Sequence, residues 1–343
     1  MLRVDVPHCP IDGADGIARY ADVRDAFFAT PGRWTYRQHQ QSGHLWLDPR
    51  PADSAIADIY SNYYTHADAA SAASTGVWQQ ALALALAARL GYPAPKSPRR
   101  LAKLVSVLPS VGAAAELEVM RIPASETGRL LDVGCGGGAF LRRMRQAGWA
   151  VTGTEPDAKA AARLAAAEGF PVYGTLDDLL RERVQGFDLI VLSHVIEHLP
   201  DPLQTLTQLR SLLRAGGRLL LTTPNARSLG LRIFGASWRG LEPPRHFNVF
   251  SPDSLRQALE RTGFQVQRMS TDVRLARGIW YLSYLARKGG VALESRRGPG
   301  RRFLKFAGYV FQLVEALAVK LGPSLGEEIF CAASIADAAG DAP

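Results

Sequence analysis

The sequence predicts an α/β protein built on a doubly wound, Rossmann-like parallel sheet. Three observations favour this fold class. Apolar runs of strand length recur between residues 129 and 224, helical patterns separate them, and a glycine-rich loop follows the first run. Because these runs are mostly continuous rather than alternating, we expect strands that are buried on both faces of the sheet.

Seven strands can be placed in chain order. They are 129–133, 150–155, 170–173, 187–193, 218–224, 264–270 and 328–335. Helical patterns lie between the early strands, at 139–147, 158–168 and 202–213, and the Gly216–Gly217 pair is a C-terminal stop signal for the last of them. The order of these elements predicts a seven-stranded sheet with crossover helices.

The rest of the chain divides around this core. We expect an irregular N-terminal segment (1–55), a helical cap or lid (56–125), the core (126–272), a basic helical insertion before the last strand (273–326), and the last strand with a tail (327–343).

The insertion carries a helix pattern and most of the charge asymmetry. Apolar residues from Phe303 to Leu321 follow helical spacing, and we expect much of this helix to be covered, with Glu315 on its polar side. The net charge is +8, and ten Lys/Arg against two Glu between Arg274 and Lys320 account for all of it. This segment predicts a basic face that contacts an anionic membrane, a phosphorylated substrate or nucleic acid. The alternative is a basic insertion that is simply solvated.

Cysteine usage and hydropathy bear on the compartment. Cys9, Cys135 and Cys331 are odd in number and far apart, which suits a reducing compartment. The first ten residues lack an apolar signal region, and no uncharged run reaches the roughly 18 residues of a membrane span. We expect a cytoplasmic protein. Peripheral contact with the inner face of the membrane is a further option for such a protein.

The loop "LLDVGCGGGAF" (130–140) fits two cofactor patterns. Gly134, Gly136 and Ala139 match the G-x-G-x-x-G/A spacing of a dinucleotide site, while Gly134, Gly136 and Gly138 match the G-x-G-x-G of an adenosylmethionine site. The glycines alone leave both open. Asp132 favours the second, because its carboxylate would repel a pyrophosphate at the helix N-terminus and would attract an ammonium group.

Glu155 ends the second predicted strand, 23 residues after Asp132. An acidic side chain at this position can accept hydrogen bonds from both hydroxyls of a ribose. Because dinucleotide sites use a similar spacing, Glu155 predicts a ribose but does not indicate whether it belongs to a dinucleotide or to adenosylmethionine.

With these residues identified, residues 126–272 resemble the class I S-adenosylmethionine-dependent methyltransferases. The matching motifs, in the family's order, are "LLDVGCGGGAF", "GTEPD", "FDLIVLSHVIEHLPDP", "LLRAGGRLLLTTPN" and "PPRHFNVFSPDSLRQALERTGF". The resemblance implies S-adenosyl-L-methionine as cofactor and a small-molecule acceptor. It places Asp132, Gly134, Cys135 and Gly136 at the methionine end, Glu155 at the ribose, Thr175 and Leu176 at the adenine, and Ser193 and His194 beside the methyl donor.

Methyl transfer from a sulfonium is an in-line displacement, so the protein mainly positions the acceptor and excludes water. A hydroxyl acceptor also needs a base. His246, in "PPRHFN", is our candidate base, and His194 is the second candidate catalytic residue. The alternative for His246 is a histidine bonded to its own loop.

His194, Glu197 and His198 are spaced to share one face of a short helix. Ubiquinone-biosynthesis O-methyltransferases have a comparable acidic and histidine cluster, which predicts a divalent-cation site as an alternative. Because the same "EH" pair occurs in metal-independent relatives, we expect no resident metal.

The first fifty residues resemble the zinc ribbon that opens many bacterial sugar and secondary-metabolite methyltransferases. "HLWLDPRP" (44–51) and "IYSNYY" (59–64) match its ending, but the four ligand positions read Cys9, Asp12, His39 and Ser42. We predict a degenerate ribbon that folds without metal. Tyr63 and Tyr64 are candidate lid residues over the cofactor.

These observations predict an enzyme that methylates a small molecule, first of all a hydroxyl or sugar in glycan, lipid or secondary-metabolite biosynthesis. Quinone-type O-methylation at the membrane is the alternative. A nucleic-acid-binding or non-catalytic protein is a third hypothesis, but no nucleic-acid partner is expected. The chain has no nucleic-acid-binding motif, and no N-P-P-Y motif of base methylation follows the fourth strand.

Overall fold

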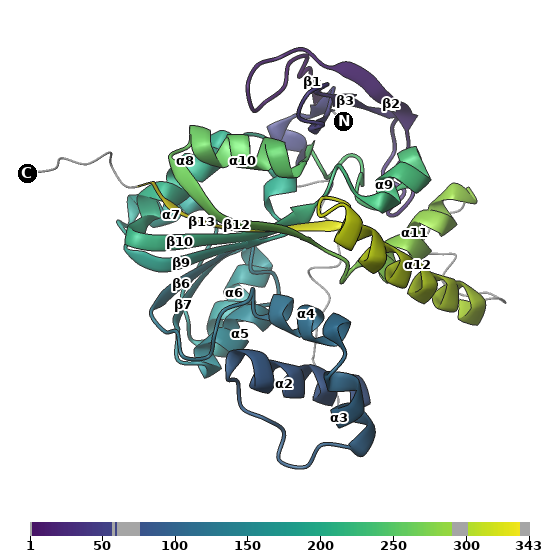
Figure 1. Ribbon diagram of the computed structural model, residues 1–343. Coiled ribbons are helices and arrows are strands. Elements are labelled where there is room, and N and C mark those ends of the chain that lie inside the picture. Colours follow the sequence, from purple (N-terminus) through teal and green to yellow (C-terminus); the bar gives the residue numbers. More distant parts are fainter. Residues whose placement is uncertain (1, 57–58, 60–75, 290–300, 337–343) are drawn as a thin grey trace, which may run out of the picture. The chain divides into compact units, whose positions relative to one another are not determined.

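The computed structural model describes residues 2–56, 59, 76–289 and 301–336 (Figure 1). These form two compact units. Unit 1 comprises Met1–Tyr63, Ser193–Arg210 and Leu221–Pro343, and unit 2 comprises Tyr64–Leu192 and Ser211–Leu220. Two predicted features, the lid tyrosines Tyr63 and Tyr64 and most of the arginine-rich stretch 295–302, lie outside the described residues.

A seven-stranded sheet confirms the predicted fold class. Its strands run in the order β12-β13-β10-β9-β6-β7-β8. Their bounds are Arg129–Val133 (β6), Ala150–Thr154 (β7), Val172–Tyr173 (β8), Phe187–Ser193 (β9), Leu213–Pro224 (β10), Phe264–Asp272 (β12) and Glu328–Ile335 (β13). β6 pairs in parallel with both β7 and β9, whereas β12 and β13 are antiparallel. The strand order therefore reverses beside β6, where doubly wound folds bind their ligands.

The burial of the strands in unit 2 explains why their sequences are continuous apolar runs. In β6 every residue after Arg129 is buried, and in β7 every residue after Ala150 is buried. The helices of this unit are Val77–Leu90 (α2), Arg100–Ser106 (α3), Pro109–Glu118 (α4), Ala139–Gln146 (α5), Ala158–Glu168 (α6) and Leu176–Arg181 (α7). Asp157 caps α6 by accepting the amide hydrogens of Lys159 and Ala160, which explains where that helix begins.

Unit 1 holds a second, four-stranded sheet in the order β11-β4-β3-β2. The strands are Ile17–Val23 (β2), Trp34–Gln38 (β3), Leu45–Leu47 (β4) and Asn248–Val249 (β11), and Arg3–Val4 (β1) pairs with Arg50–Pro51 (β5). The expected irregular segment 1–55 thus contains five short antiparallel strands. The expectation was wrong because these strands are short and part of their pairing comes from β11, far along the chain.

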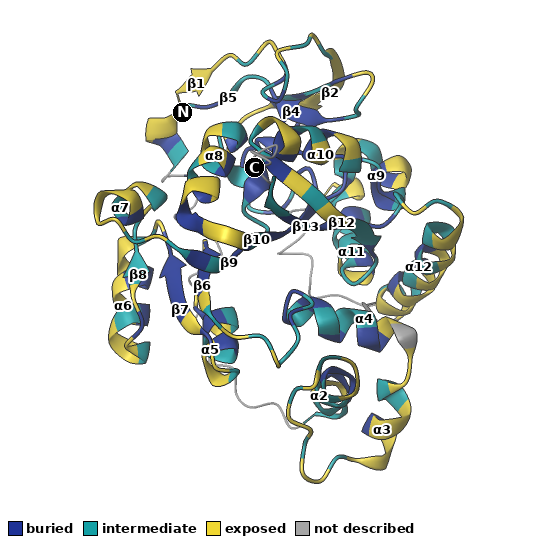
Figure 2. Ribbon diagram, turned by 60° about the vertical axis from the view of Figure 1, so that its left-hand side comes forward, coloured by how far each residue is buried: buried dark blue, intermediate teal, exposed yellow. Residues whose placement is uncertain are grey.

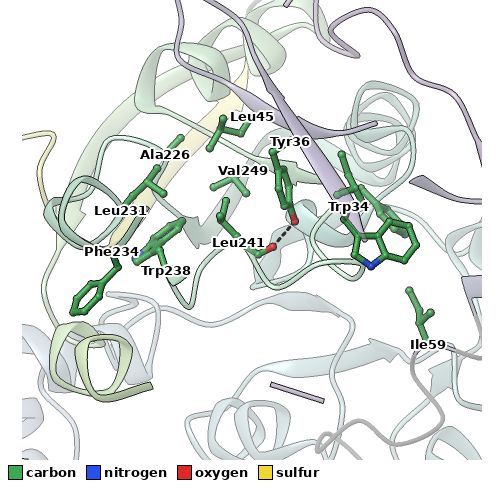
Figure 3. Packing of buried hydrophobic residues seen from close by; sticks show 12 residues of the cluster. Trp34, Tyr36, Leu45, Ile59, Ala226, Leu231, Phe234, Trp238, Leu241 and Val249 are labelled. Atoms are coloured by element: carbon green, nitrogen blue, oxygen red, sulfur yellow. Dashed lines mark hydrogen bonds between the residues drawn. The ribbon is translucent and has the colours of Figure 1, made fainter. Parts of the chain in front are cut away.

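An aromatic cluster joins this small sheet to the segment after β10. Trp34, Tyr36, Phe234 and Trp238 pack together with Leu241 in a buried core (Figure 3). The Tyr36 hydroxyl donates to the carbonyl oxygen of Leu241 and lies 2.8 Å from that of His246. This core therefore fixes the backbone of the loop that carries His246.

The remaining helices of the described chain are Pro202–Leu212 (α8), Leu229–Phe234 (α9), Pro252–Arg261 (α10), Ala276–Arg287 (α11) and Arg301–Leu321 (α12), with 3₁₀ turns at Asp53–Ala55 (η1), Ile196–His198 (η3) and Gly235–Ser237 (η4). Gly216 and Gly217, predicted to end a helix, lie inside β10 instead, because α8 already ends at Leu212. In the described residues no helix combines the length and apolar content needed to cross a bilayer.

The predicted covering of the insertion helix is wrong. On α12, Phe303, Leu313 and Leu321 are exposed, while Phe311 and Glu315 are buried. The periodicity identified the apolar stripe, but the stripe is exposed, and the covered side holds the apolar Phe311 together with Glu315.

Candidate active site

The glycine loop leaves β6 and enters α5 through left-handed backbone. Gly134, Gly136 and Gly138 have φ angles of 69°, 52° and 72°, a region that side chains with a Cβ rarely adopt. The loop is fastened to β7, since the amide of Gly134 donates to Thr154 Oγ1 at 3.2 Å. A Cβ on Gly138 would stand 2.5 Å from Leu164 of α6, so only glycine permits this close packing. The loop backbone is held open toward any ligand at the end of β6.

Cys135 is a packing residue of this loop. Its amide donates to the Thr154 carbonyl at 2.8 Å, and its thiol lies so close to β7 that a Cβ on Gly153 would be 2.7 Å from the sulfur. Burial raises the pKa of the thiol far above its usual range. The thiol therefore stays protonated at neutral pH.

Asp132 is a buried carboxylic acid at the end of β6, only 4% exposed. Burial raises its pKa to about 8, and the nearby charge of Glu155 adds to the effect. Within the described residues, no hydrogen bond or cation partners this carboxylate. A ligand cation fits this site, because it would supply the missing counter-charge, and a pyrophosphate does not fit.

Glu155 is also buried, at 6% exposure, and it is tied to the loop. Its Oε2 accepts the Gly136 amide hydrogen at 3.0 Å, and its Oε1 accepts that of Asp157 at 3.0 Å. A carboxylate has about four acceptor positions, so both oxygens can still accept from further hydroxyls. This arrangement suits the ribose contact that the sequence predicts.

Thr175 and Leu176 begin α7. The Thr175 hydroxyl is engaged in a capping box, because it accepts the Asp178 amide hydrogen at 3.2 Å and donates to the Asp178 carboxylate at 2.8 Å. Leu176, the first residue of the helix, is half-buried. The Thr175 amide also donates to the Asp178 carboxylate at 2.8 Å, so an adenine contact from Thr175 would use its backbone carbonyl.

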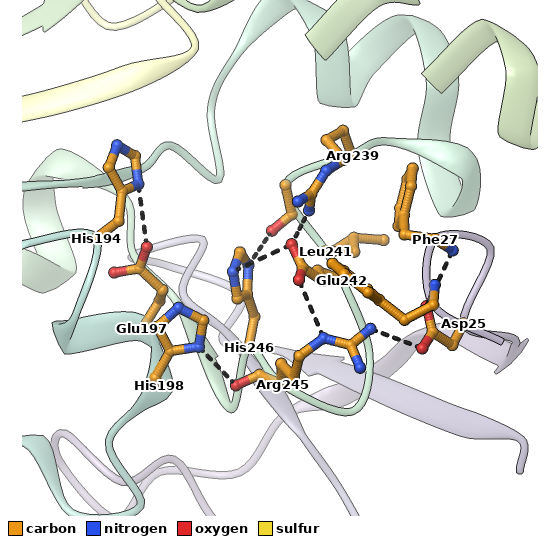
Figure 4. Close-up of polar contacts among 12 residues, drawn as sticks. Asp25, Phe27, His194, Glu197, His198, Arg239, Leu241, Glu242, Arg245 and His246 are labelled. Atoms are coloured by element: carbon orange, nitrogen blue, oxygen red, sulfur yellow. Dashed lines mark hydrogen bonds and ion pairs between the residues drawn. The ribbon is translucent and has the colours of Figure 1, made fainter. Parts of the chain in front are cut away.

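His194, directly after β9, is held between two carboxylates in unit 1. Figure 4 shows the contact with Glu197. Its Nδ1 lies 3.2 Å from Glu197 Oε1 and its Nε2 lies 2.6 Å from Glu328 Oε1. Burial alone would lower the pKa of His194, but the hydrogen bonds and charges of the two glutamates raise it to about 10. His194 is therefore an imidazolium at neutral pH, able to donate a proton but not to accept one.

The two glutamates are held in place by other partners. Glu197 also accepts from Thr223 Oγ1 at 3.0 Å, and Arg274 Nη2 lies 2.9 Å from Glu328 Oε1. Ser193, the last residue of β9, is exposed, and its Oγ lies 3.4 Å from Thr222 Oγ1.

His246 is buried and its tautomer is fixed by its own loop. Its Nδ1 donates to the Gly240 carbonyl at 2.7 Å, which leaves Nε2 as an acceptor. Burial holds the pKa of His246 well below its usual value, and the charge of neighbouring His198 acts in the same direction. His246 is thus neutral at pH 7, with one nitrogen bonded to its loop and the other bearing a lone pair.

One group of potential metal ligands lies in this cluster. The ligand atoms of Glu197, His198 and His246 are all within 4.8 Å of one another. The cluster differs from the sequence-based alternative, because His246 takes the place of His194. A carboxylate with two neutral imidazoles is a donor set that first-row divalent metals accept.

A family model described as a methyltransferase domain matches residues 99–268, the range that holds all five quoted motifs. Residues 99–268 are therefore similar to methyltransferase domains. The resemblance to class I S-adenosylmethionine-dependent methyltransferases is thereby confirmed.

Curated relatives align with part of this domain. The ubiquinone biosynthesis O-methyltransferase of Xanthomonas axonopodis pv. citri is 33% identical over 154 residues, which cover 41% of this chain and 64% of that protein. The protein of the same name from Caulobacter sp. is 35% identical over 143 residues, with 38% and 57% covered. This chain therefore spans less than two thirds of the length of either relative.

Among solved structures, a SAM-dependent methyltransferase from Archaeoglobus fulgidus is 19% identical, with a TM-score of 0.42 over 64% of this chain and 92% of that one.

Sequence reasoning missed a buried ion-pair network beside the methyltransferase domain's histidines. Arg245 is 1% exposed; its Nη2 lies 2.6 Å from Asp25 Oδ2 and its Nε lies 3.0 Å from Glu242 Oε1 (Figure 4). Arg239 pairs with the same Glu242. The only local signal was the position of Arg245 next to His246, since Asp25 is 220 residues away in the chain.

The four predicted ribbon positions do come together in unit 1. They sit in two similar turns, closed by hydrogen bonds from Gly13 to the Cys9 carbonyl (2.8 Å) and from Gly43 to the His39 carbonyl (2.9 Å). His39 Nε2 lies 3.4 Å from Asp12 Oδ2, and its Nδ1 accepts from the Ser42 amide at 3.0 Å. Asp12 is also hydrogen-bonded to the Cys9 side chain. Direct polar contacts therefore join the positions that bind zinc in a complete ribbon.

Proposed function

We propose that this chain is an S-adenosyl-L-methionine-dependent methyltransferase with a small-molecule acceptor. The observation that carries the proposal is the buried carboxylate of Asp132, which lacks a counter-charge in the described structure and lies next to a glycine loop. The methyltransferase family match supports it.

When bound, S-adenosyl-L-methionine supplies a methyl group on a sulfonium, ready for displacement. In unit 2, Asp132 would pair with its ammonium group while the Gly134 and Gly136 backbone lies against its methionine part. Glu155 would accept hydrogen bonds from the ribose hydroxyls, and Leu176 would contact the adenine. Thr175, Cys135 and Ser193 remain predicted cofactor contacts. The hydroxyls of Thr175 and Ser193 already have partners in the protein, so we expect less from these two side chains.

For the acceptor we propose a phenolic hydroxyl of the quinol type. The relatives named as ubiquinone biosynthesis O-methyltransferases favour this alternative over the sugar acceptor that the sequence first suggested. A phenol has a pKa near 10, so proton removal assists its attack on a methyl group.

In unit 1, His246 would accept the acceptor's proton at Nε2, because its Nδ1 is bonded to the Gly240 carbonyl; Glu242 Oε2 lies 3.7 Å from that Nε2. His194, held as an imidazolium by Glu197 and Glu328, would attract the phenolate that results. The competing arrangement places a divalent cation on Glu197, His198 and His246, where it would polarise the phenolic oxygen directly.

Transfer of a labelled methyl group from S-adenosyl-L-methionine to a soluble catechol, with and without a chelator, tests the proposal. We expect transfer by the wild type, loss of transfer in Asp132→Asn, and little effect of the chelator. If the chelator abolishes activity and magnesium or zinc restores it, a bound metal, and not His246 as a base, activates the phenol. Absence of transfer to catechols alongside transfer to a sugar would overturn the acceptor assignment.

A further inference from the structure

The insertion helix α12 carries an exposed apolar stripe along its whole length. The helix is 21 residues long, about 31 Å, and the exposed fraction reaches 71% at Phe303 and 91% at Leu321. The stripe consists of Phe303, Phe306, Tyr309, Val310, Leu313, Val314, Leu317 and Leu321, all at least 44% exposed (Figure 2). These residues recur at three- and four-residue intervals, so they share one side of the helix.

The opposite side of α12 is the one that the protein covers. Gly308 lets α12 approach α11 closely, since a Cβ there would lie 3.0 Å from Arg277. Gln312 Nε2 donates to the Val273 carbonyl at 2.8 Å, and Glu315 is fully buried. A helix on the surface of a protein in water normally shows its polar side to solvent and packs its apolar side inward. The covered side of α12 holds Phe311 beside Gln312 and Glu315, yet a second apolar side, the stripe, still faces outward. This exposed apolar side points to a partner for the stripe.

The charge of the insertion indicates what that partner is. The segment from Arg274 to Lys320 holds ten basic and two acidic residues, and Glu315 is removed from the surface by burial. Lys305 and Lys320 on α12 itself are exposed. A second copy of the chain would bring two such basic segments together, and a nucleic acid would leave the apolar stripe unused. An anionic phospholipid surface matches both features, because it offers acyl chains to the stripe and phosphates to the lysines and arginines.

We propose that α12 docks this protein on an anionic phospholipid bilayer, lying in the plane of the interface with its apolar stripe among the acyl chains. The helix lies on the membrane without spanning it. The proposal concerns a surface outside residues 99–268 and holds whichever acceptor the methyltransferase domain uses.

Sedimentation with vesicles tests the proposal on the full chain. Phosphatidylcholine vesicles are compared with vesicles that also contain phosphatidylglycerol. We expect the wild type to bind the anionic vesicles and to be released by high salt. Leu313→Asp with Leu317→Asp should weaken this binding by about tenfold or more, because the stripe can no longer insert. The matched control, Leu2→Asp with Val4→Asp, makes the same charge change at exposed apolar positions of the N-terminal segment and should keep wild-type binding within about twofold.

Two readouts keep the outcome unambiguous. The S-adenosyl-L-methionine affinity and melting temperature of each variant report on folding separately from lipid binding. Equal vesicle binding by the α12 variant and the wild type overturns the proposal, as does wild-type binding that ignores lipid charge and salt. A wild-type dimer in lipid-free buffer that becomes a monomer in the α12 variant, with no vesicle binding by either, assigns the stripe to a second copy and also overturns it.

Discussion

The raised pKa of Asp132 makes a strong prediction about how cofactor affinity varies with pH. The free carboxyl has a pKa of about 8, because it is buried near Glu155 without a partner. An α-amino group has a pKa of roughly 7.7–8.0. The proposed ion pair needs the carboxyl ionised and the amine protonated. Below pH 8 binding therefore releases a proton from Asp132, and above pH 8 it takes one up at the amine.

The magnitude follows from this linkage. Well below pH 8 each pH unit should weaken binding about tenfold. Because both groups are about half titrated at pH 8, the affinity at pH 6 should be lower than at pH 8 by about 25-fold, or about 1.9 kcal/mol. Above pH 8 the affinity should fall again by about tenfold per unit, which gives a maximum near pH 8.

Titration calorimetry in buffers of different ionisation enthalpy measures both the affinity and the protons exchanged. Asp132→Asn should bind more weakly at pH 8 and should lose the dependence between pH 6 and 8. S-adenosylhomocysteine, which keeps the ammonium group but lacks the sulfonium, should give the same profile as the methyl donor. A flat wild-type profile between pH 6 and 8, or an Asp132→Asn profile that keeps its slope, would refute the pairing of Asp132 with the ammonium.

Three further predictions concern unit 1. Glu315→Met should raise the free energy of unfolding by about 1–3 kcal/mol, as both carboxylate oxygens are buried without a hydrogen bond. Burial raises the pKa of Glu315 from 4.5 to about 9, so the folded chain keeps a proton that the unfolded chain loses, and wild-type stability falls across this interval. The gain in the free energy of unfolding, measured with urea, should be larger at pH 8 than at pH 5. An equal gain at both pH values would contradict this prediction. Arg245→Met should cost about 3–5 kcal/mol, because it leaves Asp25 buried without its guanidinium partner and leaves Glu242 with Arg239 alone, and a loss below 1 kcal/mol would contradict it. His246→Ala should lower kcat for methyl transfer by about 100-fold or more while the dissociation constant of S-adenosyl-L-methionine stays within about twofold, and an unchanged kcat would exclude His246 as the base.

The features that sequence reasoning placed correctly are local ones. The loop around Gly134, the carboxylate of Asp132 and the position of Glu155 at the end of the second strand depend on neighbours within one β-α-β unit, so their pattern is visible in the chain. The doubly wound sheet followed from the same periodicity.

The features that it missed depend on contacts between distant segments. The charge of His194 is set by Glu197 together with Glu328, and Glu328 is 134 residues away. The burial of Arg245 depends on Asp25 at a separation of 220 residues. Periodicity gave the apolar stripe of α12, but which side is covered depends on the packing of α11, which a helical pattern does not encode.

Parallel equilibrium titrations of the purified chain with S-adenosyl-L-methionine and with NAD test the central claim most directly, because the glycine spacing alone fits both ligands. The account predicts saturable binding of S-adenosyl-L-methionine at one site per chain, weakened by Glu155→Gln, and no binding of NAD. Saturable binding of NAD with no uptake of S-adenosyl-L-methionine would contradict it.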